Sequence, residues 1–342
     1  MEKVEDGDIL ITSANGSSNL VGKHCIIYNI ENENMVHGGF MLLMKSNFPH
    51  FMNSYLDSQW YKKFINSNVM GGNGAIGNLK KIDLENYYTF FTSTSEENKI
   101  NEYYKYFDNL ISLHQRKLTL LENIKKALLN KIFPKNNEIK PEIRFKGFVD
   151  AWEQKKLIDE GKTYSGLSNK TKFDFNRGDA KFITYLNVLN NEFIDLRMHG
   201  KISIDKTQNL VKNGDILFTI SSETPHDIGM SSVYLGDENN LYLNSFCFGY
   251  RFNKKINDSI FIGFLFRSSK LRKEISDLAQ GISRFNMSKS SFLKLNINFP
   301  KYDEQIYVGN LFSNVNNLIS LHQRKLKKLE NIKKALLNKM FI

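Results

Sequence analysis

The chain has 342 residues, 41% of them hydrophobic, and a formal net charge of +11 at pH 7. That is enough apolar material for two domains with separate cores. The two cysteines, Cys25 and Cys247, exclude a disulfide scaffold and favour a cytoplasmic location. An acidic N-terminal stretch argues against a signal peptide, and no run of about 18 apolar residues predicts a membrane span. The positive charge favours a polyanionic partner such as nucleic acid, with a solvated lysine-rich surface as the alternative.

One long stretch of sequence occurs twice. Asn109–Lys131 reads NLISLHQRKLTLLENIKKALLNK, and Asn317–Lys339 repeats it with only two replacements. The similarity continues upstream, where the GDIL motif of Gly7–Leu10 recurs at Gly214–Leu217. We therefore interpret the chain as a tandem duplication, in which a variable globular part precedes an almost invariant helix.

The first globular part, residues 1–102, starts just before its GDIL motif, whereas a long segment precedes the motif in the second copy. We expect this part to lack most of its N-terminal third, either because the chain is a fragment or because its gene begins inside a former repeat. Its glycine-rich run Gly72–Gly77 has GxGxxG spacing. However, a helix-like segment precedes this run and a strand-like segment follows it, which is the reverse of a dinucleotide site. Asn78-Leu79 replace the lysine and hydroxyl residue of a P-loop, so we interpret the run as a flexible loop.

The duplicated helices, residues 103–133 and 305–342, carry apolar residues at heptad-like spacing. This pattern favours an antiparallel coiled coil between the two copies; the alternative is that each helix packs on its own globular part. His114 and His322 recur among the leucines of the stripe, which is typical of packed polar residues that set register. The predicted seam consists of Phe107, Leu110, His114, Leu121, Ile124, Leu128, Val315, Leu318, His322, Leu329, Ile332 and Leu336.

These helices also hold nearly all of the net charge, which suits either DNA phosphates or a solvated face. About 25 helical residues span roughly 37 Å, close to one turn of B-DNA, about 34–36 Å. Two recognition domains at the ends of such a pair would face half-sites about one turn apart.

Residues 134–148 are polar, contain two prolines and form the predicted linker. The second globular part, residues 149–304, is complete and mixes both element types. Strand-like runs occur at Lys181–Val188, Asp215–Ser221 and Ser232–Leu235, and helical spacing covers Phe261–Ala279. The expected fold is therefore α+β, with two mixed α/β domains joined by two long helices.

Three loops of the second part have the side chains that contact bases and phosphates. One follows the strand-like run at Asp215–Ser221, one follows Gly281, and a basic one begins at Ser168. Plain surface or local capping is the alternative for each loop. The candidate DNA-binding residues are Lys170, Lys172, Ser221, Ser222, Thr224, His226, Arg284, Asn286, Ser288 and Lys289.

Sequence signs of catalysis are missing. There is no Pro-Pro dipeptide, such as amino-methyltransferases carry, and neither HExxH nor Cys-x-x-Cys occurs, so we predict no catalytic and no metal-binding residues.

Several segments resemble the specificity (S) subunit of type I restriction–modification systems. The C-terminal LISLHQRKLxxLENIKKALLNKMF is similar to the distal conserved region of that family, and Pro141–Leu157 is similar to the entry of a target recognition domain. Ser221–Gly236, Tyr242–Phe252 and Ala279–Phe292 resemble interior segments of such a domain. The departure is the missing start of the first domain.

The resemblance implies a non-catalytic subunit that reads a bipartite site in double-stranded DNA, one half-site per recognition domain. It implies two methyltransferase subunits and a restriction subunit as partners, with S-adenosylmethionine, ATP and Mg²⁺ bound by those partners only. The alternative is a free-standing DNA-binding regulator that dimerises through its coiled coil.

Overall fold

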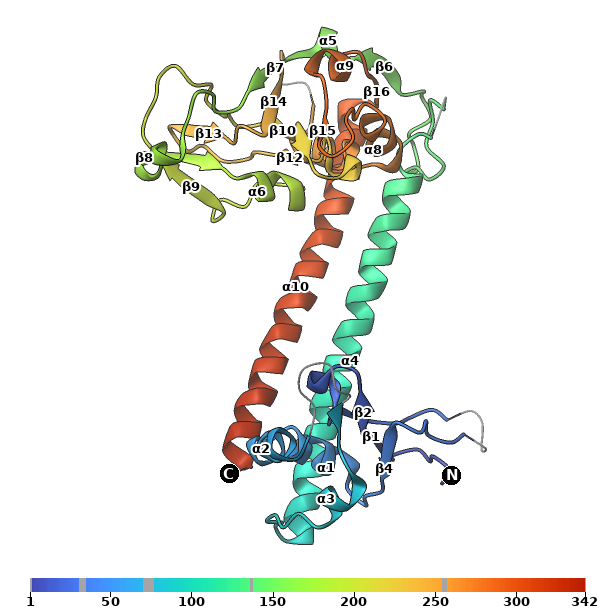
Figure 1. Cartoon of the computed structure of the whole chain (residues 1–342). Helices are drawn as coiled ribbons and strands as arrows, with labels where there is room; N and C mark the ends of the chain where they lie inside the picture. Colours follow the sequence, from blue (N-terminus) through green and yellow to red (C-terminus); the bar gives the residue numbers. More distant parts are fainter. Residues whose placement is uncertain (1, 31–34, 70–76, 136–137, 254–256, 342) are drawn as a thin grey trace. The chain divides into compact units, whose positions relative to one another are not determined.

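The computed structural model describes residues 2–30, 35–69, 77–135, 138–253 and 257–341. These residues form two compact units (Figure 1). Unit 1 comprises Met1–Thr119 with Ser320–Ile342, and unit 2 comprises Leu120–Ile319. Each unit thus contains a stretch of both long helices, α4 (Thr94–Lys131) and α10 (Tyr302–Met340).

Unit 1 is built on a three-stranded antiparallel sheet in the order β3-β1-β4. Its strands are β1 (Ile9–Thr12), β3 (His24–Ile26) and β4 (Met41–Met44). A short ribbon pairs β2 (Ala14–Asn15) with β5 (Gly77–Asn78). The remaining short elements are η1 (Ser18–Leu20), α1 (Pro49–Leu56), α2 (Gln59–Asn68) and α3 (Lys81–Glu85). The inward-facing Ile9 and Ile11 of β1 pack on Phe64 of α2, which gives this unit its own core.

Unit 2 has a four-stranded antiparallel sheet in the order β12-β10-β14-β7. Its strands are β7 (Gly161–Ser165), β10 (Ile216–Thr219), β12 (Ser231–Val233) and β14 (Cys247–Phe252). Helices α7 (Ser259–Leu265) and α8 (Ser269–Ser276) follow this sheet in the chain. The fully buried rings of Phe218, Phe248 and Phe292 meet in the core, with ring centroids 4.7–5.2 Å apart.

A second sheet of unit 2 has the order β13-β8-β9, with β13 and β8 parallel. A separate ladder pairs β16 with β6. The strands are β6 (Glu153–Lys156), β8 (Phe175–Ile183), β9 (His199–Ile202), β13 (Leu241–Leu243) and β16 (Asn296–Phe299). The short helices are α5 (Leu157–Glu160), η2 (Lys172–Asp174), α6 (Tyr185–Asn190), η3 (Pro225–Asp227) and α9 (Lys289–Leu293).

Two predicted elements are divided in the structure. The run Lys181–Val188 is half strand and half helix, because Thr184 caps α6 by accepting a hydrogen bond from the backbone N–H of Asn187 at 3.3 Å. The helical pattern of Phe261–Ala279 forms two helices, α7 and α8, rather than one. In the glycine-rich run, residues 71–76 lie outside the described residues, and Gly77 begins β5.

The duplication extends through the globular parts. Gly7 and Gly214 of the two GDIL motifs both have positive φ, 94° and 85°, as a tight turn before a strand requires. The ribbon β2–β5 corresponds to a ribbon in unit 2 formed by β11 (Ser221–Ser222) and β15 (Phe285–Asn286). Unit 1 from β1 onward therefore repeats the element order of unit 2 from β10 onward, except that β13 and β16 have no strand counterpart in the described part of unit 1.

Within each unit the two long helices pair antiparallel, as predicted. In unit 1, Tyr104 lies beside Met340, Asp108 beside Lys333, and His114 beside His322. Residue numbers rise along α4 as they fall along α10. In unit 2, Phe133, just past the end of α4, stacks on Phe312 of α10 at a centroid distance of 5.9 Å.

The seam differs in part from the expected one. Phe107 and Val315 are buried, and the predicted residues at heptad spacing from them are half-buried, but Ile124, Leu318 and Ile332 are exposed. Two paired helices bury only a narrow stripe of side chains. In α4 the second set of residues at seven-residue spacing in this stripe contains Ile111, whereas the prediction had used the set that contains Leu110. This set, with its counterpart in α10, includes two half-buried lysines, Lys125 and Lys333.

Both seam lysines occupy the same position in the repeat and both are neutralised. The Lys125 ammonium lies 2.5 Å from a Glu192 carboxylate oxygen, and the Lys333 ammonium lies 2.6 Å from Asp108. None of the described helices has the length and apolarity needed to cross a membrane.

Candidate nucleic-acid interface

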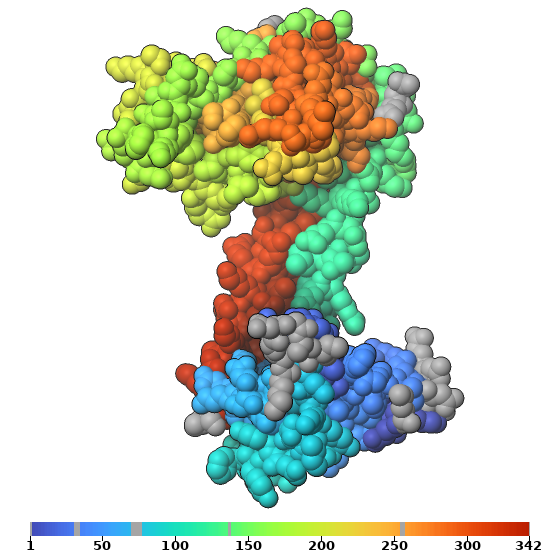
Figure 2. Space-filling model, in the orientation of Figure 1, coloured from blue at the N-terminus to red at the C-terminus, as the bar shows by residue number. Residues whose placement is uncertain are grey.

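Two of the three predicted loops meet in one ribbon of unit 2. Strands β11 and β15 pair antiparallel, with Ser221 opposite Asn286 and Ser222 opposite Phe285. The ribbon begins where the central strand β10 ends, and the Ile220 N–H there donates to the Phe246 carbonyl at 2.9 Å. The orange segment that contains β15 and α9 reaches the surface of unit 2 (Figure 2). Residues 65 and 63 positions apart in the chain are thus paired in one ribbon.

Arg284 is the exposed cation of this ribbon. Its Nε donates a hydrogen bond to the Ser221 hydroxyl at 3.0 Å, and its guanidinium lies over the Phe246 ring, 4.8 Å from the centroid. Its two terminal nitrogens contact no acceptor in the part of the chain that the structure describes. An arginine held over an aromatic ring, with its terminal N–H groups unpaired in the described chain, suits a bidentate acceptor such as a guanine edge or a phosphate.

The other predicted ribbon residues divide into exposed and supporting ones. Asn286 and Ser288 are exposed, whereas Ser221 and Ser222 are buried. The Ser221 hydroxyl holds Arg284, and the Ser222 hydroxyl accepts a hydrogen bond from the Thr224 N–H at 3.3 Å, so both serines suit positioning better than base contact. The Lys289 ammonium donates to the Ser165 hydroxyl at 2.5 Å, which ties the ribbon to the end of β7.

The loop after β11 carries Thr224 and His226, both exposed, around the short helix η3. Arg272 of α8 holds this loop from inside. Its guanidinium donates to the backbone carbonyls of Gly229 at 2.6 Å, His226 at 2.8 Å and Ile228 at 2.9 Å. Burial is the main cause that lowers the pKa of Arg272 to about 10. The loop conformation therefore depends on one half-buried cation.

The sequence did not point to Arg272 or Phe246. Phe246 has a weak signal, since it is an exposed aromatic in the polar turn Asn244–Phe246 between two strands. Arg272 has none, because its helix pattern is that of any amphipathic helix and its carbonyl partners lie more than 40 residues away.

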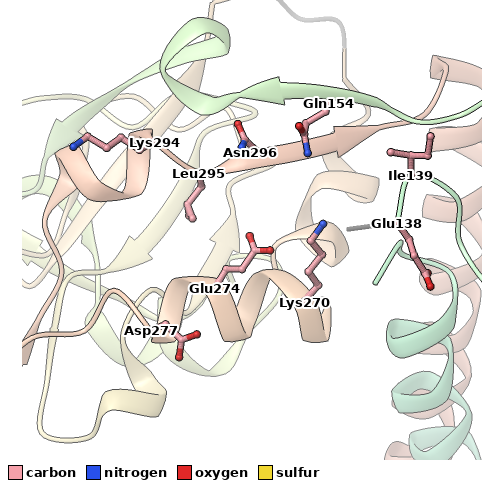
Figure 3. A pocket seen from close by; sticks show the side chains of 9 residues that line it. All are labelled: Glu138, Ile139, Gln154, Lys270, Glu274, Asp277, Lys294, Leu295 and Asn296. Atoms are coloured by element: carbon pink, nitrogen blue, oxygen red, sulfur yellow. The ribbon is translucent and has the colours of Figure 1, made fainter. Parts of the chain in front are cut away.

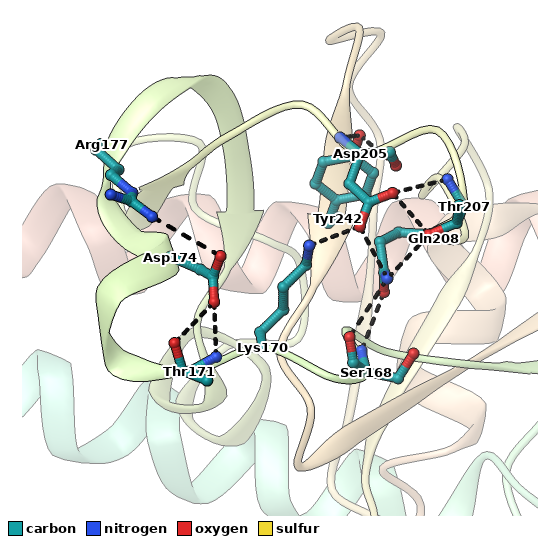
Figure 4. A network of polar contacts seen from close by, with 9 residues as sticks. All are labelled: Ser168, Lys170, Thr171, Asp174, Arg177, Asp205, Thr207, Gln208 and Tyr242. Carbon is teal, nitrogen blue, oxygen red and sulfur yellow. Dashed lines mark hydrogen bonds and ion pairs between the residues drawn. The ribbon is translucent and has the colours of Figure 1, made fainter.

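The third predicted loop uses most of its charged side chains for contacts within unit 2 (Figure 4). Lys170 forms an ion pair with Asp205 at 2.6 Å, and this hydrogen bond is the main cause that raises the pKa of Lys170 and lowers that of Asp205. Thr171 and Asp174 form a capping box for η2. Of the two predicted lysines only Lys172 is exposed, with its ammonium 5.3 Å from the Phe173 ring centroid. The charge of Lys170 is thus already matched inside the loop.

A separate cavity of about 470 Å³ in unit 2 is lined by both signs of charge (Figure 3). Lys270 and Lys294 lie with Glu138, Glu274 and Asp277 around it. Burial is the main cause that raises the pKa of Glu274, while Lys270 counteracts it. The mixture of charges does not favour either a polyanion or a cation.

A metal-binding cluster and an activated cysteine are two kinds of reactive group that occur in enzyme sites. The described residues contain no group of three or more His, Cys, Asp or Glu side chains that could hold a metal ion. Burial raises the pKa of the Cys247 thiol far above its ordinary value, which disfavours the nucleophilic thiolate.

Comparison with known proteins identifies similar chains. The putative type I restriction enzyme MjaX specificity subunit of Methanocaldococcus jannaschii is 24% identical over 201 residues, which cover 56% of this chain and 46% of that protein. The type I restriction enzyme MjaVIII specificity subunit of the same organism is 22% identical over 283 residues, 81% of this chain and 66% of that protein. This chain therefore spans between about half and two thirds of the length of these relatives.

Solved structures share the fold. A type I restriction–modification S subunit from M. genitalium matches with a TM-score of 0.60 at 13% identity, covering 98% of this chain and 83% of that one. A chain from a study of complex assembly and conformational transition in a type I restriction–modification system matches with a TM-score of 0.53 at 13% identity, covering 99% and 83%. Residues 150–331, slightly more than half of the sequence, match the family model of the type I restriction modification DNA specificity domain. The chain belongs to this family.

Proposed function

We propose that this chain is the DNA-recognition subunit of a type I restriction–modification complex, and that unit 2 reads its half-site through the β11–β15 ribbon. The observation that carries the proposal is Arg284, exposed on that ribbon, stacked on Phe246 and held by Ser221. These residues lie inside the segment that matches the specificity-domain family. Asn286 on the same ribbon, and Thr224 and His226 on the adjoining loop, add groups that hydrogen-bond to base edges.

The bipartite readout is part of the same proposal. Unit 1 repeats the ribbon as β2–β5, with Ala14 opposite Asn78 and Asn15 opposite Gly77. The segment that corresponds to the Arg284 loop lies outside the described residues. A second half-site would be contacted by this ribbon.

The proposed partners are two methyltransferase subunits and a restriction subunit, which would supply S-adenosylmethionine, ATP and Mg²⁺ chemistry. The relatives named above are specificity subunits, and the two long helices offer exposed lysines beyond the seam. In this proposal the chain itself performs no chemical step.

The test begins by mapping methylated adenines in cells with and without this gene, which gives the target sequence. Binding of the purified subunit, alone and with its methyltransferase partner, is then measured on target and scrambled duplexes over a salt titration. We expect Arg284→Ala to weaken binding to the target by roughly 5- to 100-fold, since a bidentate base contact is worth about 1–3 kcal/mol. Binding to scrambled DNA should change much less.

Arg197→Ala is the matched control. Arg197 is also exposed, but it pairs with its neighbour Asp195 at 2.8 Å instead of facing the ribbon. An equal loss on both duplexes for Arg284→Ala would reduce Arg284 to a phosphate contact. An unchanged methylome without the gene would refute the specificity-subunit assignment itself and favour a free-standing regulator.

A further inference from the structure

The loop that leads into β15 is closed at its base. Gln280 and Asn286 exchange two backbone hydrogen bonds, at 2.9 and 2.8 Å, and residues 281–285 form the loop between them. The chain turns at Gly281, where φ is 139° and a Cβ would lie only 2.0 Å from the backbone carbonyl oxygen of Arg284. The turn therefore requires glycine, and the backbone conformation of the loop is set by this turn and by the two hydrogen bonds.

Ile282 follows this turn, and its side chain lies in solvent. It is 97% exposed, whereas Val149, the next most exposed large apolar residue in the described part of unit 2, is 72% exposed. Moving apolar surface out of water is favourable, and the folding of unit 2 does not use this contribution at Ile282. The side chain is thus available for an apolar contact with a partner.

The residues around Ile282 in the chain favour nucleic acid over protein as that partner. Ser283, Arg284 and Asn286 are exposed and polar, whereas Phe285 is half-buried. A protein-docking surface needs a contiguous apolar patch, and a single isoleucine among polar neighbours does not form one. The Arg284 guanidinium instead places a positive charge two residues from Ile282 in the chain, which suits a polyanion.

The chemistry of base edges indicates what Ile282 can contact. In the major groove, base pairs present hydrogen-bond donors and acceptors and one apolar group, the C5 methyl of thymine. Consecutive base pairs are about 3.4 Å apart, and two residues of extended chain span at most about 7 Å. Ile282 and Arg284 can therefore reach neighbouring base pairs in the same groove.

We propose that Ile282 is a specificity-determining residue that packs on the C5 methyl of one thymine in the half-site of unit 2. The proposal rests on DNA reading by the β11–β15 ribbon and adds a second kind of contact to it. Arg284 distinguishes bases through hydrogen bonds, whereas Ile282 distinguishes thymine from the other bases through its methyl group.

The test uses uracil in place of thymine, because an A·U pair presents the same donors and acceptors as an A·T pair and lacks only the methyl group. The target sequence comes from the map of methylated adenines. Each thymine of the two half-sites is replaced singly by uracil in a fluorescent duplex. The affinity of the full chain with its methyltransferase partner is then measured by fluorescence anisotropy at one salt concentration.

We expect uracil at one thymine to weaken binding by roughly fourfold, because burying one methyl-sized group is worth about 0.8 kcal/mol. Ile282→Ala should weaken binding to the thymine duplex by roughly four- to tenfold, because it removes the apolar side of the same contact. On this variant, uracil at the same position should have less than about a twofold effect, because the contact is already lost.

Val149→Ala is the matched control, because Val149 is an exposed apolar residue that precedes β6 and lies outside the ribbon. This variant should bind the thymine duplex as the unaltered chain does and should retain the uracil effect in full. Both substitutions shorten exposed side chains, so both variants should fold.

Three results would overturn the inference while specific binding, and with it the proposed function, remains intact. These are no uracil effect at any thymine of the target, a uracil effect that Ile282→Ala leaves unchanged, and a loss in Ile282→Ala that is equal for the thymine duplex and every uracil duplex. The last result would indicate insertion of the side chain between base pairs. A complex that binds target and scrambled duplexes equally would instead refute the proposed function itself.

A fourth result concerns a protein contact. If Ile282→Ala no longer binds the methyltransferase partner in size-exclusion chromatography, Ile282 contacts protein rather than thymine, and the inference is wrong.

Discussion

Glu304 and Glu96 occupy the same position in the two copies of the repeat, but Glu304 is buried and Glu96 is exposed. Glu304→Ala leaves Arg144, whose side chain is 14% exposed, without its carboxylate and also removes the acceptor of the Trp152 N–H. Removing one partner of a buried ion pair costs about 3–5 kcal/mol because the other charge stays buried and uncompensated. We expect a loss of about 3 kcal/mol in the free energy of unfolding of unit 2. Glu96→Ala, at the same place in the repeat, should cost at most about 1 kcal/mol from the helix dipole.

Urea unfolding followed by tryptophan fluorescence measures both losses. The chain has two tryptophans, Trp60 in unit 1 and Trp152 in unit 2, so a Trp60→Phe background makes the signal specific for unit 2. Replacing Arg144 and Glu304 together should cost clearly less than the sum of the single losses. Additive losses, or equal effects of Glu304→Ala and Glu96→Ala, would refute the reasoning that burial sets the cost.

Three further predictions concern pH, the ribbon loop and a glycine. Burial, followed by the neighbouring charges, lowers the pKa of His114, whose Nδ1 lies 2.8 Å from that of His322. The contribution of the neutral His114 to stability is therefore fully present above the ordinary histidine pKa of 6.5 and is lost as pH falls through the lowered value. Unit 1 should thus unfold at a lower urea concentration at pH 5.5 than at pH 7.5, and His114→Gln should reduce this difference. Arg272→Met leaves three loop carbonyls unsatisfied and should destabilise unit 2 by about 1–3 kcal/mol while weakening target DNA binding; a variant with normal stability and binding would contradict this. Gly229→Ala should lower the free energy of unfolding by more than about 1 kcal/mol, because φ is 63° and the new Cβ would lie 2.1 Å from an α8 side chain. Gly16→Ala is the control, because a Cβ there would meet open space. Equal melting temperatures for the two variants would disprove the steric argument.

The candidate site was only partly predictable. The sequence indicated the Ser221 and Arg284 loops because serine, asparagine and arginine near glycine or proline are typical of contact loops. It gave equal weight to Lys170, which the structure pairs with Asp205, 35 residues away. It also placed Ile124 and Ile332 in the seam, because heptad spacing alone is compatible with two neighbouring rows.

What the sequence by itself determined is the duplication and the family resemblance, and its heptad spacing favoured the antiparallel pair of long helices. These are properties of local pattern, since a repeat and a heptad period can be read from consecutive residues. Only the tertiary structure decided that β11 pairs with β15, that Phe246 lies beneath Arg284, and that Glu304 is buried while Glu96 is not. Each of these depends on residues distant in sequence, whose pairing is set by how the core closes, and a local pattern does not encode that choice.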